Sequence, residues 1–223
     1  MKVSIIIPVL NEAGHIADTL LPLLPCRDQG HEVIVVDGGS DDATVTLAEQ
    51  HADSVLHSDA GRALQMNQGI DAADGDVLLF LHADTRLPAG AIENIIAVVE
   101  DGHFWGRFNV RLTGKHVLFR VIESMMNLRS CITGVATGDQ AIFVSRESIE
   151  IVGSYPSLPL MEDIEFSKRL RNLGWPACLR RPVLTSSRRW EDRGILRTML
   201  LMWRLRLLYF LGVPAEKLAS QYR

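Results

Sequence analysis

A histidine and an aspartate follow an unbroken apolar run in this chain of 223 residues. The run covers residues 77–81 and gives way to His82-Ala83-Asp84. Five apolar residues between polar neighbours are typical of a strand buried on both faces of a parallel sheet. Ligands bind such sheets at the carboxyl ends of the strands, so Asp84 is predicted at the mouth of a binding crevice. A carboxylate there could hold a divalent cation, which in turn holds phosphates.

Two further polar clusters follow stretches that are predicted to be strands. Pro8 closes the first stretch and is followed by Asn11 and Glu12, while Asp37 and Gly39 follow the second. Because the carboxyl ends of parallel strands meet at one edge of a sheet, the clusters are expected to lie together. Asp37 could accept hydrogen bonds from a base or a ribose, and Gly39 leaves room for a flat ligand. Each cluster alone is more often an ordinary turn.

A predicted helix over residues 62–73 supplies two candidate binding residues. Arg62 and Gln65 lie about one helical turn apart and could face the same ligand. An arginine near the start of a helix suits a phosphate or a base oxygen. A solvated helix surface explains the same residues equally well, so the sequence leaves both interpretations open.

Three acids in the second half of the chain are candidates for contact with an acceptor. Glu162 and Asp163 fall in the first turn of a predicted helix over residues 161–172, where acids ordinarily complement the helix dipole. One of them could instead act as a general base on an acceptor hydroxyl. Asp139 could accept hydrogen bonds from sugar or acceptor hydroxyls, although a turn explains this residue equally well.

The elements that must position these residues alternate between strand and helix. Such alternation implies an α/β fold with a mostly parallel central sheet flanked by helices. Strands are expected over residues 3–9, 33–36, 53–57 and 76–81, with helices over 11–24, up to about 50, over 62–73 and over 89–100. Beyond residue 100 the pattern predicts a half-buried strand over 104–112, a short strand over 141–144, and helices over 116–129 and 161–172.

Composition and missing motifs argue against several classes of protein. The net charge of −4 gives no basic footprint for nucleic acid. Neither G-x-G-x-x-G after the first strand nor G-x-x-x-x-G-K-[ST] occurs, which disfavours hydride transfer and P-loop phosphoryl transfer. The scattered Cys26, Cys131 and Cys178 predict reduced thiols in a cytoplasmic protein. The apolar start of the chain stops too soon for an export signal, and no apolar run is long enough to span a membrane.

The segment 195–213 is long, apolar and basic. It could be a core helix packed on the sheet, a homodimer interface, or a helix lying flat on an anionic membrane. Core or dimer packing is favoured over membrane contact. The membrane interpretation would place the protein at the inner face of the membrane.

The ordered set of motifs resembles glycosyltransferase family 2, in particular a small bacterial branch with Phe-Leu-His-Ala-Asp-Thr at residues 80–85. The resemblance covers roughly residues 3–175. It implies a GT-A fold and a metal-dependent, inverting transfer of a sugar from a nucleotide-sugar, with UDP expected as the carrier and Mn²⁺ or Mg²⁺ as the cation. A single domain over 1–223 is expected, with a nucleotide-binding half up to about 100, an acceptor half over about 101–193, and a C-terminal helix over about 194–223.

The resemblance also suggests roles for individual residues. Asp84 is similar to the last aspartate of the family's Asp-x-Asp metal motif, and Asp37 to the aspartate that contacts the base. Asn11 and Glu12 resemble the first-loop nucleotide contacts. Asp163 resembles the catalytic base, with Glu162 beside it. The family pattern departs at His82, where the first acid of the metal motif would stand.

Other functions remain open on the sequence. A nucleotide-binding scaffold of the same fold without transferase activity is the main alternative, and His82 motivates it. Sugar-nucleotide synthesis is disfavoured because no glycine-rich phosphate loop follows the first strand. Arg188 and Arg189 could neutralise a diphosphate or an anionic acceptor, and Trp190 could stack on a sugar. If His82 merely replaces an acid, His82→Asp is expected to preserve or improve metal-dependent activity.

Overall fold

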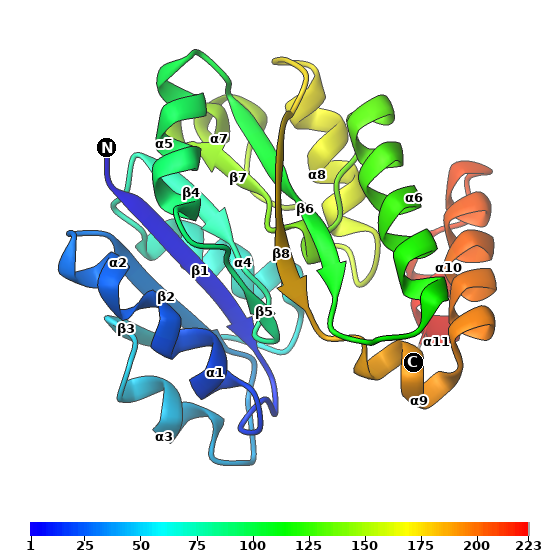
Figure 1. The fold of residues 1–223 in the computed structure, drawn as a ribbon, viewed down its shortest axis with the longest axis horizontal. Helices are drawn as coiled ribbons and strands as arrows, with labels where there is room; N and C mark the ends of the chain where they lie inside the picture. Colours follow the sequence, from blue (N-terminus) through cyan, green and yellow to red (C-terminus); the bar gives the residue numbers. More distant parts are fainter. Residues whose placement is uncertain (223) are drawn as a thin grey trace.

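A sheet of eight strands organises the computed structural model, which describes residues 1–222 (Figure 1). The strand order is β3-β2-β1-β4-β7-β6-β8-β5. Side chains that alternate along β1 feed two cores, one on each face of the sheet. Ile5 and Ile7 pack with Ile16 of the neighbouring helix, whereas Ile6 packs with Met66 on the other face. With both faces covered by apolar side chains, polar chemistry is confined to the strand ends.

The first half of the chain confirms the predicted alternation. Strands β1 to β4 pair in parallel, and helices separate them along the chain. The strands are β1 (Val3–Val9), β2 (Glu32–Asp37), β3 (Ser54–His57) and β4 (Val77–Phe80). The helices are α1 (Ile16–Leu20), the 3₁₀ turn Leu21–Leu23, α2 (Leu24–Asp28), α3 (Thr44–Glu49), α4 (Arg62–Ala72) and α5 (Ala91–Glu100).

The second half makes the sheet mixed. Strand β7 (Phe143–Ser145) runs antiparallel to β4 and to β6 (Trp105–Leu112), while β8 (Ala177–Thr185) is parallel to β6 and pairs with β5 (Thr85–Arg86). The helices are α6 (Val117–Thr133), the 3₁₀ turn η2 (Gly138–Gln140), α7 (Arg146–Val152), α8 (Glu162–Arg171), α9 (Arg188–Arg193), α10 (Ile195–Phe210) and α11 (Ala215–Tyr222).

Two local expectations differ from the structure. Asn11 does not cap a helix: it has a φ of 54°, its side-chain oxygen accepts a hydrogen bond from the Asp41 N–H, and α1 begins only at Ile16. Strand β6 is buried on both faces rather than half-buried, with Arg107 enclosed between it and Asn127 of α6. Strand β8 was not predicted, because Arg180-Arg181-Pro182 interrupts its apolar pattern.

The segment 195–213 does not pack on the sheet, so the core-helix interpretation is wrong. Thr198 and Leu205 are the residues of α10 that are buried. Leu205 packs with Leu218 of α11 and Ile164 of α8, which leaves the opposite side of α10 exposed. The dimer and membrane interpretations stay predictions. Among the described residues, no helix is long and apolar enough to cross a membrane.

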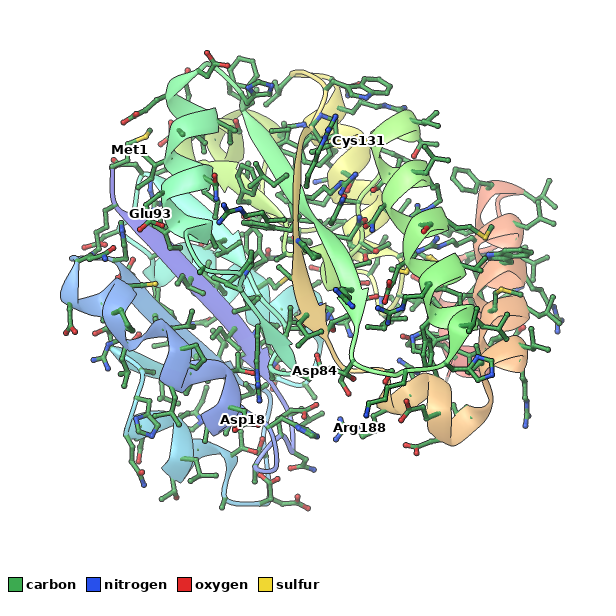
Figure 2. The ribbon with its side chains drawn as sticks, in the orientation of Figure 1. Met1, Asp18, Asp84, Glu93, Cys131 and Arg188 are labelled. Atoms are coloured by element: carbon green, nitrogen blue, oxygen red, sulfur yellow. A yellow bond between two sulfur atoms is a disulfide. The ribbon has the colours of Figure 1, made fainter. Side chains whose placement is uncertain are left out.

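The expectation of three reduced thiols is also wrong. Cys131 of α6 and Cys178 of β8 form a disulfide, with Cα atoms 6.2 Å apart, and Cys26 is free and half-buried. The two cysteines stand 47 residues apart, and tertiary packing of α6 on the sheet brings them together. Figure 2 places Cys131 at the opposite end of the molecule from Asp84.

Candidate functional site

A cleft of about 560 Å³ opens at the carboxyl ends of β1 and β4. This volume is in the range of small-molecule sites. Nine predicted site residues line it: Pro8, Glu12, Arg62, Gln65, His82, Asp84, Asp139, Glu162 and Asp163. Arg188, Arg189 and Trp190 of α9 close its other side. Figure 2 shows Asp84 and Arg188 near each other at this end of the molecule.

Asn11, Asp37 and Gly39 lie beside the cleft and do not line it. Asp37 is buried at the end of β2, where its carboxylate accepts hydrogen bonds from the N–H groups of Gly39 and Ser40, at 3.0 Å each. Burial favours the neutral acid, but hydrogen bonds from Ser40 and Gly39 outweigh it and lower the pKa of Asp37. Asp37 therefore braces the loop after β2, and its contact with a base stays a prediction.

Gln65 has a structural task in addition to its place in the cleft wall. Its Nε2 donates to the carbonyl of Val9 at 2.7 Å and to that of Val36 at 2.8 Å. These bonds tie the ends of β1 and β2 to α4. A Cβ at Gly38 would lie 3.1 Å from the Gln65 side chain, a tight contact, so the glycine eases this close approach.

The acid pair at the start of α8, Glu162 and Asp163, lines the cleft. Asp163 accepts hydrogen bonds from the Gly138 N–H at 2.9 Å and from its neighbour Ile164 at 2.8 Å. Glu162 is buried and lies 3.4 Å from Nη1 of Arg62. Burial and the charge of Asp163 raise the pKa of Glu162, and Arg62 opposes them. One acid of the pair is thus drawn towards its neutral form.

His82 connects the end of β4 to η2. Its Nδ1 lies 3.3 Å from Asp139, and its Nε2 is buried against Gly138, with no hydrogen-bond partner among the described residues. Burial of Asp139 opposes ionisation, but His82, Arg62 and Arg206 outweigh it and hold the pKa of Asp139 at about 2. The imidazole therefore lies between an ionised acid and the backbone that holds Asp163.

A divalent cation fits the cleft at Asp84. Glu12 pairs with Arg188, Asp139 with His82 and Glu162 with Arg62. By contrast, Asp84 pairs with no cation within residues 1–222. Burial raises the pKa of Glu12, with Arg188 opposing and Asp84 adding to the rise.

The described residues contain no cluster of three or more histidine, cysteine or acid ligands. A site of one or two carboxylates completed by donor phosphates is how Mg²⁺ is commonly bound. The residues present therefore suit a cation that arrives with its phosphates.

Sequence reasoning missed four residues that line the cleft from the C-terminal segment. They are Thr198, Met202 and Arg206 of α10 and Tyr222 of α11. Arg189 holds Tyr222 by stacking over its ring at 3.7 Å and by donating to its backbone carbonyl at 3.1 Å. Arg206 stood out as a basic residue in an apolar helix, but the side it faces depends on how α10 docks. Nothing in the sequence around Tyr222 indicated that this residue would line a site.

Comparison with known families and sequences gives a consistent result. The family model described as Glycosyl transferase family 2 matches residues 4–144. An undecaprenyl-phosphate 4-deoxy-4-formamido-L-arabinose transferase of Proteus mirabilis (strain HI4320) is 31% identical over 113 residues, which cover 46% of this chain and 35% of that protein. The corresponding protein of Yersinia pestis (strain Pestoides F) is 31% identical over 151 residues, 62% of this chain and 46% of its own length. The chain spans less than half of these relatives.

Solved structures resemble most of this fold. S. aureus TarS 1–349 in complex with UDP-GlcNAc superposes with a TM-score of 0.68 at 19% identity, covering 83% of this chain and 58% of that one. The mannosyltransferase PcManGT of Pyrobaculum calidifontis, in complex with GDP-Man and Mn²⁺, gives 0.66 at 21% identity over 92% of this chain and 60% of that one. At these identities the likeness concerns the fold alone.

The contacts of His82 change what His82→Asp is expected to do. A carboxylate at this position would face Asp139 and repel it, so we expect kcat/KM for sugar transfer to fall by about tenfold or more. His82→Asn is the matched control, because its amide keeps a hydrogen-bond donor and adds no negative charge. Steady-state kinetics of both variants, once the substrates are known, measures the effect; higher activity in His82→Asp would contradict it.

The raised pKa of Glu162 predicts a pH-dependent stability difference. The folded state keeps the Glu162 proton at pH values above 4.5, where the unfolded chain already loses it. The folded state therefore loses stability as the pH rises from 4.5 towards the raised pKa of Glu162. We expect the melting temperature of Glu162→Gln, relative to that of the wild type, to be higher at neutral pH than just below pH 4.5. For Asp37→Asn, whose acid has a lowered pKa, the difference in melting temperature from the wild type should change little over this range, because Asp37 is ionised in both the folded and the unfolded chain above the ordinary pKa of 3.8. The same difference in melting temperature between Glu162→Gln and the wild type at both pH values would refute the raised pKa of Glu162.

Proposed function

The chain belongs to glycosyl transferase family 2 and has the GT-A fold, and from this premise we propose that it transfers a sugar from a nucleotide-sugar to an acceptor hydroxyl with inversion. The observation that carries the proposal is the meeting of Asp84 with the acid pair Glu162 and Asp163 in one cleft. A metal-binding acid and a proton acceptor that line the same cleft suit displacement of a diphosphate.

The donor would lie along the ends of β1, β2 and β4. Pro8, Glu12 and Gln65 form the floor there, with Asp37 and Asn11 behind them. UDP is the expected carrier, since the family most often uses it. A Mn²⁺ or Mg²⁺ ion held by Asp84 would neutralise charge on the diphosphate as it leaves. Arg188, 3.5 Å from Glu12, adds positive charge on the same side.

Asp163 would supply the proton acceptor. As the acceptor oxygen attacks the anomeric carbon, its proton passes to the Asp163 carboxylate, and the nucleoside diphosphate leaves from the opposite face of the sugar. The Gly138 N–H holds one carboxylate oxygen of Asp163 at 2.9 Å and fixes its direction. Asp139 and His82 could orient the sugar hydroxyls.

A phosphate acceptor is the second candidate, and unpaired arginine atoms favour it. Nε of Arg206 and Nε and Nη2 of Arg129 are buried without a hydrogen-bond partner among the described residues. Burial and the nearby Arg206 lower the pKa of Arg129 to about 10. The relatives' names print undecaprenyl phosphate as the acceptor of those proteins. An ionised phosphate oxygen would attack the anomeric carbon directly and would not need Asp163 as a base.

Replacement of Asp163 distinguishes these acceptors. With a hydroxyl acceptor, Asp163→Asn should lower kcat by about a hundredfold to ten-thousandfold, because the base is lost while the shape is kept. Glu165→Gln, on the same helix and outside the cleft, is the matched control and should leave kcat unchanged. The measurement is transfer from a radiolabelled nucleotide-sugar to a panel of hydroxyl and phosphate acceptors.

Near-normal transfer by Asp163→Asn would contradict its role as a base and favour a phosphate acceptor. A nucleotide-binding scaffold would bind the nucleoside diphosphate and show no turnover with any acceptor. Hydrolysis of the nucleotide-sugar in the absence of an acceptor would be a catalytic turnover and would argue against the scaffold.

A further inference from the structure

The outer sides of α6 and α10 form an apolar surface that no described residue covers. On α10 it consists of Leu196, Leu200, Trp203, Leu207 and Phe210. On α6 it consists of Val117, Val121, Met125, Leu128 and Ile132. Residues three and four apart share one side of a helix, so each set is a continuous stripe. The exposure is large, with Leu128 at 63% and Leu207 at 61%.

The two stripes lie on neighbouring helices, which meet where the first turns of α10 pack on the first half of α6. Ile195 and Met199 of α10 pack on Phe119 and Ile122 of α6. Figure 1 shows α10 at the right-hand edge of the molecule, with α6 between it and β6. We call the two stripes together the α6–α10 face. An apolar surface of this extent on a soluble chain normally marks an interaction site.

The exposed charges that α10 and the start of α6 contribute to the α6–α10 face are basic, although Glu191 and Asp192 of α9 are exposed just before α10. Lys115, Arg197 and Arg204 are exposed, and none of them pairs with an acid within the described part of the chain. Glu123 is the one acid of the two helices, and it is buried where it accepts a hydrogen bond from the Leu112 N–H. The chain as a whole has a net charge of −4, so this cationic border results from the local placement of basic residues and not from the overall composition.

From this pattern we propose that the α6–α10 face lies on the surface of a bilayer that contains anionic lipids. Apolar side chains would enter the boundary of the acyl region, Trp203 would lie at its interface, and Arg197 and Arg204 would meet anionic headgroups. Pairing with a second copy would bring the same cations together from both chains and is disfavoured. The inference does not depend on the proposed transfer reaction.

The same helices connect the surface to the cleft. Met126 of α6 and Met202 and Arg206 of α10 line the cleft on the inner side of the helices whose outer sides form the face. A chain docked in this way would hold one wall of its cleft beside the lipid headgroups. An acceptor anchored in the bilayer would then reach the acids without leaving it.

Vesicle binding by the full chain tests the proposal. The chain should co-sediment with phosphatidylcholine vesicles that contain phosphatidylglycerol and about tenfold or more weakly with phosphatidylcholine alone, and added salt should weaken binding. Leu207→Glu should reduce binding by at least about tenfold. Ile151→Glu on α7, a site of matched exposure at 60%, should leave it unchanged. Arg204→Gln should weaken binding by about fivefold.

Two results would overturn the proposal. One is equal binding of the wild type and Leu207→Glu to the anionic vesicles. The other is a wild-type dimer in sedimentation velocity that Leu207→Glu dissociates, since the α6–α10 face would then join two copies. Circular dichroism verifies the fold of each variant, and Arg204→Gln supplies the test if Leu207→Glu does not fold.

Discussion

The hydrogen bond from the Gly138 N–H to Asp163 joins the segments on which the cleft depends. Antiparallel pairing of β7 with β4 brings η2 beside the end of β4, where the Phe80 N–H donates to Ile142 at 2.9 Å. At that point Gly138 meets both Asp163 and His82, and a larger residue would collide with the imidazole. The end of β4, η2 and the start of α8 are far apart in the sequence and thus hold one another in place. Asp163, His82 and Asp139 therefore have defined relative positions.

Pairing among the cleft charges leaves one acid free for another task. Glu12 and Glu162 each pair with an arginine, Asp139 lies beside His82, and Asp163 accepts two backbone hydrogen bonds, whereas Asp84 pairs with no cation in the described chain. Buried charges without partners are costly, so these pairs lower the cost of enclosing several acids in one wall. The remaining carboxylate is the natural place for a cation that comes with its phosphates. This distribution, rather than any single residue, suits the cleft to a diphosphate donor.

Sequence patterns predicted the elements that are buried on both faces. β1 was expected over residues 3–9 and is found there. The segment is mostly apolar at consecutive positions, which is typical of a strand buried on both faces. The place of Asp84 at a strand end followed from the same logic, whereas the roles expected of Glu162 and Asp163 came from the family resemblance. By contrast, β8 and the wall formed by Arg206 and Tyr222 depend on long-range docking, which local patterns do not encode. Composition predicted an apolar α10 but could not show that its apolar side would remain uncovered.

The central claim is that Asp84 holds the cation and diphosphate of a nucleotide-sugar, and isothermal titration tests it most directly. Wild-type chain should bind a nucleoside diphosphate, UDP or GDP, more tightly when Mn²⁺ is present. The Asp84→Asn variant should bind it weakly and with no response to the metal. Equal, metal-dependent binding by the wild type and Asp84→Asn would contradict the account.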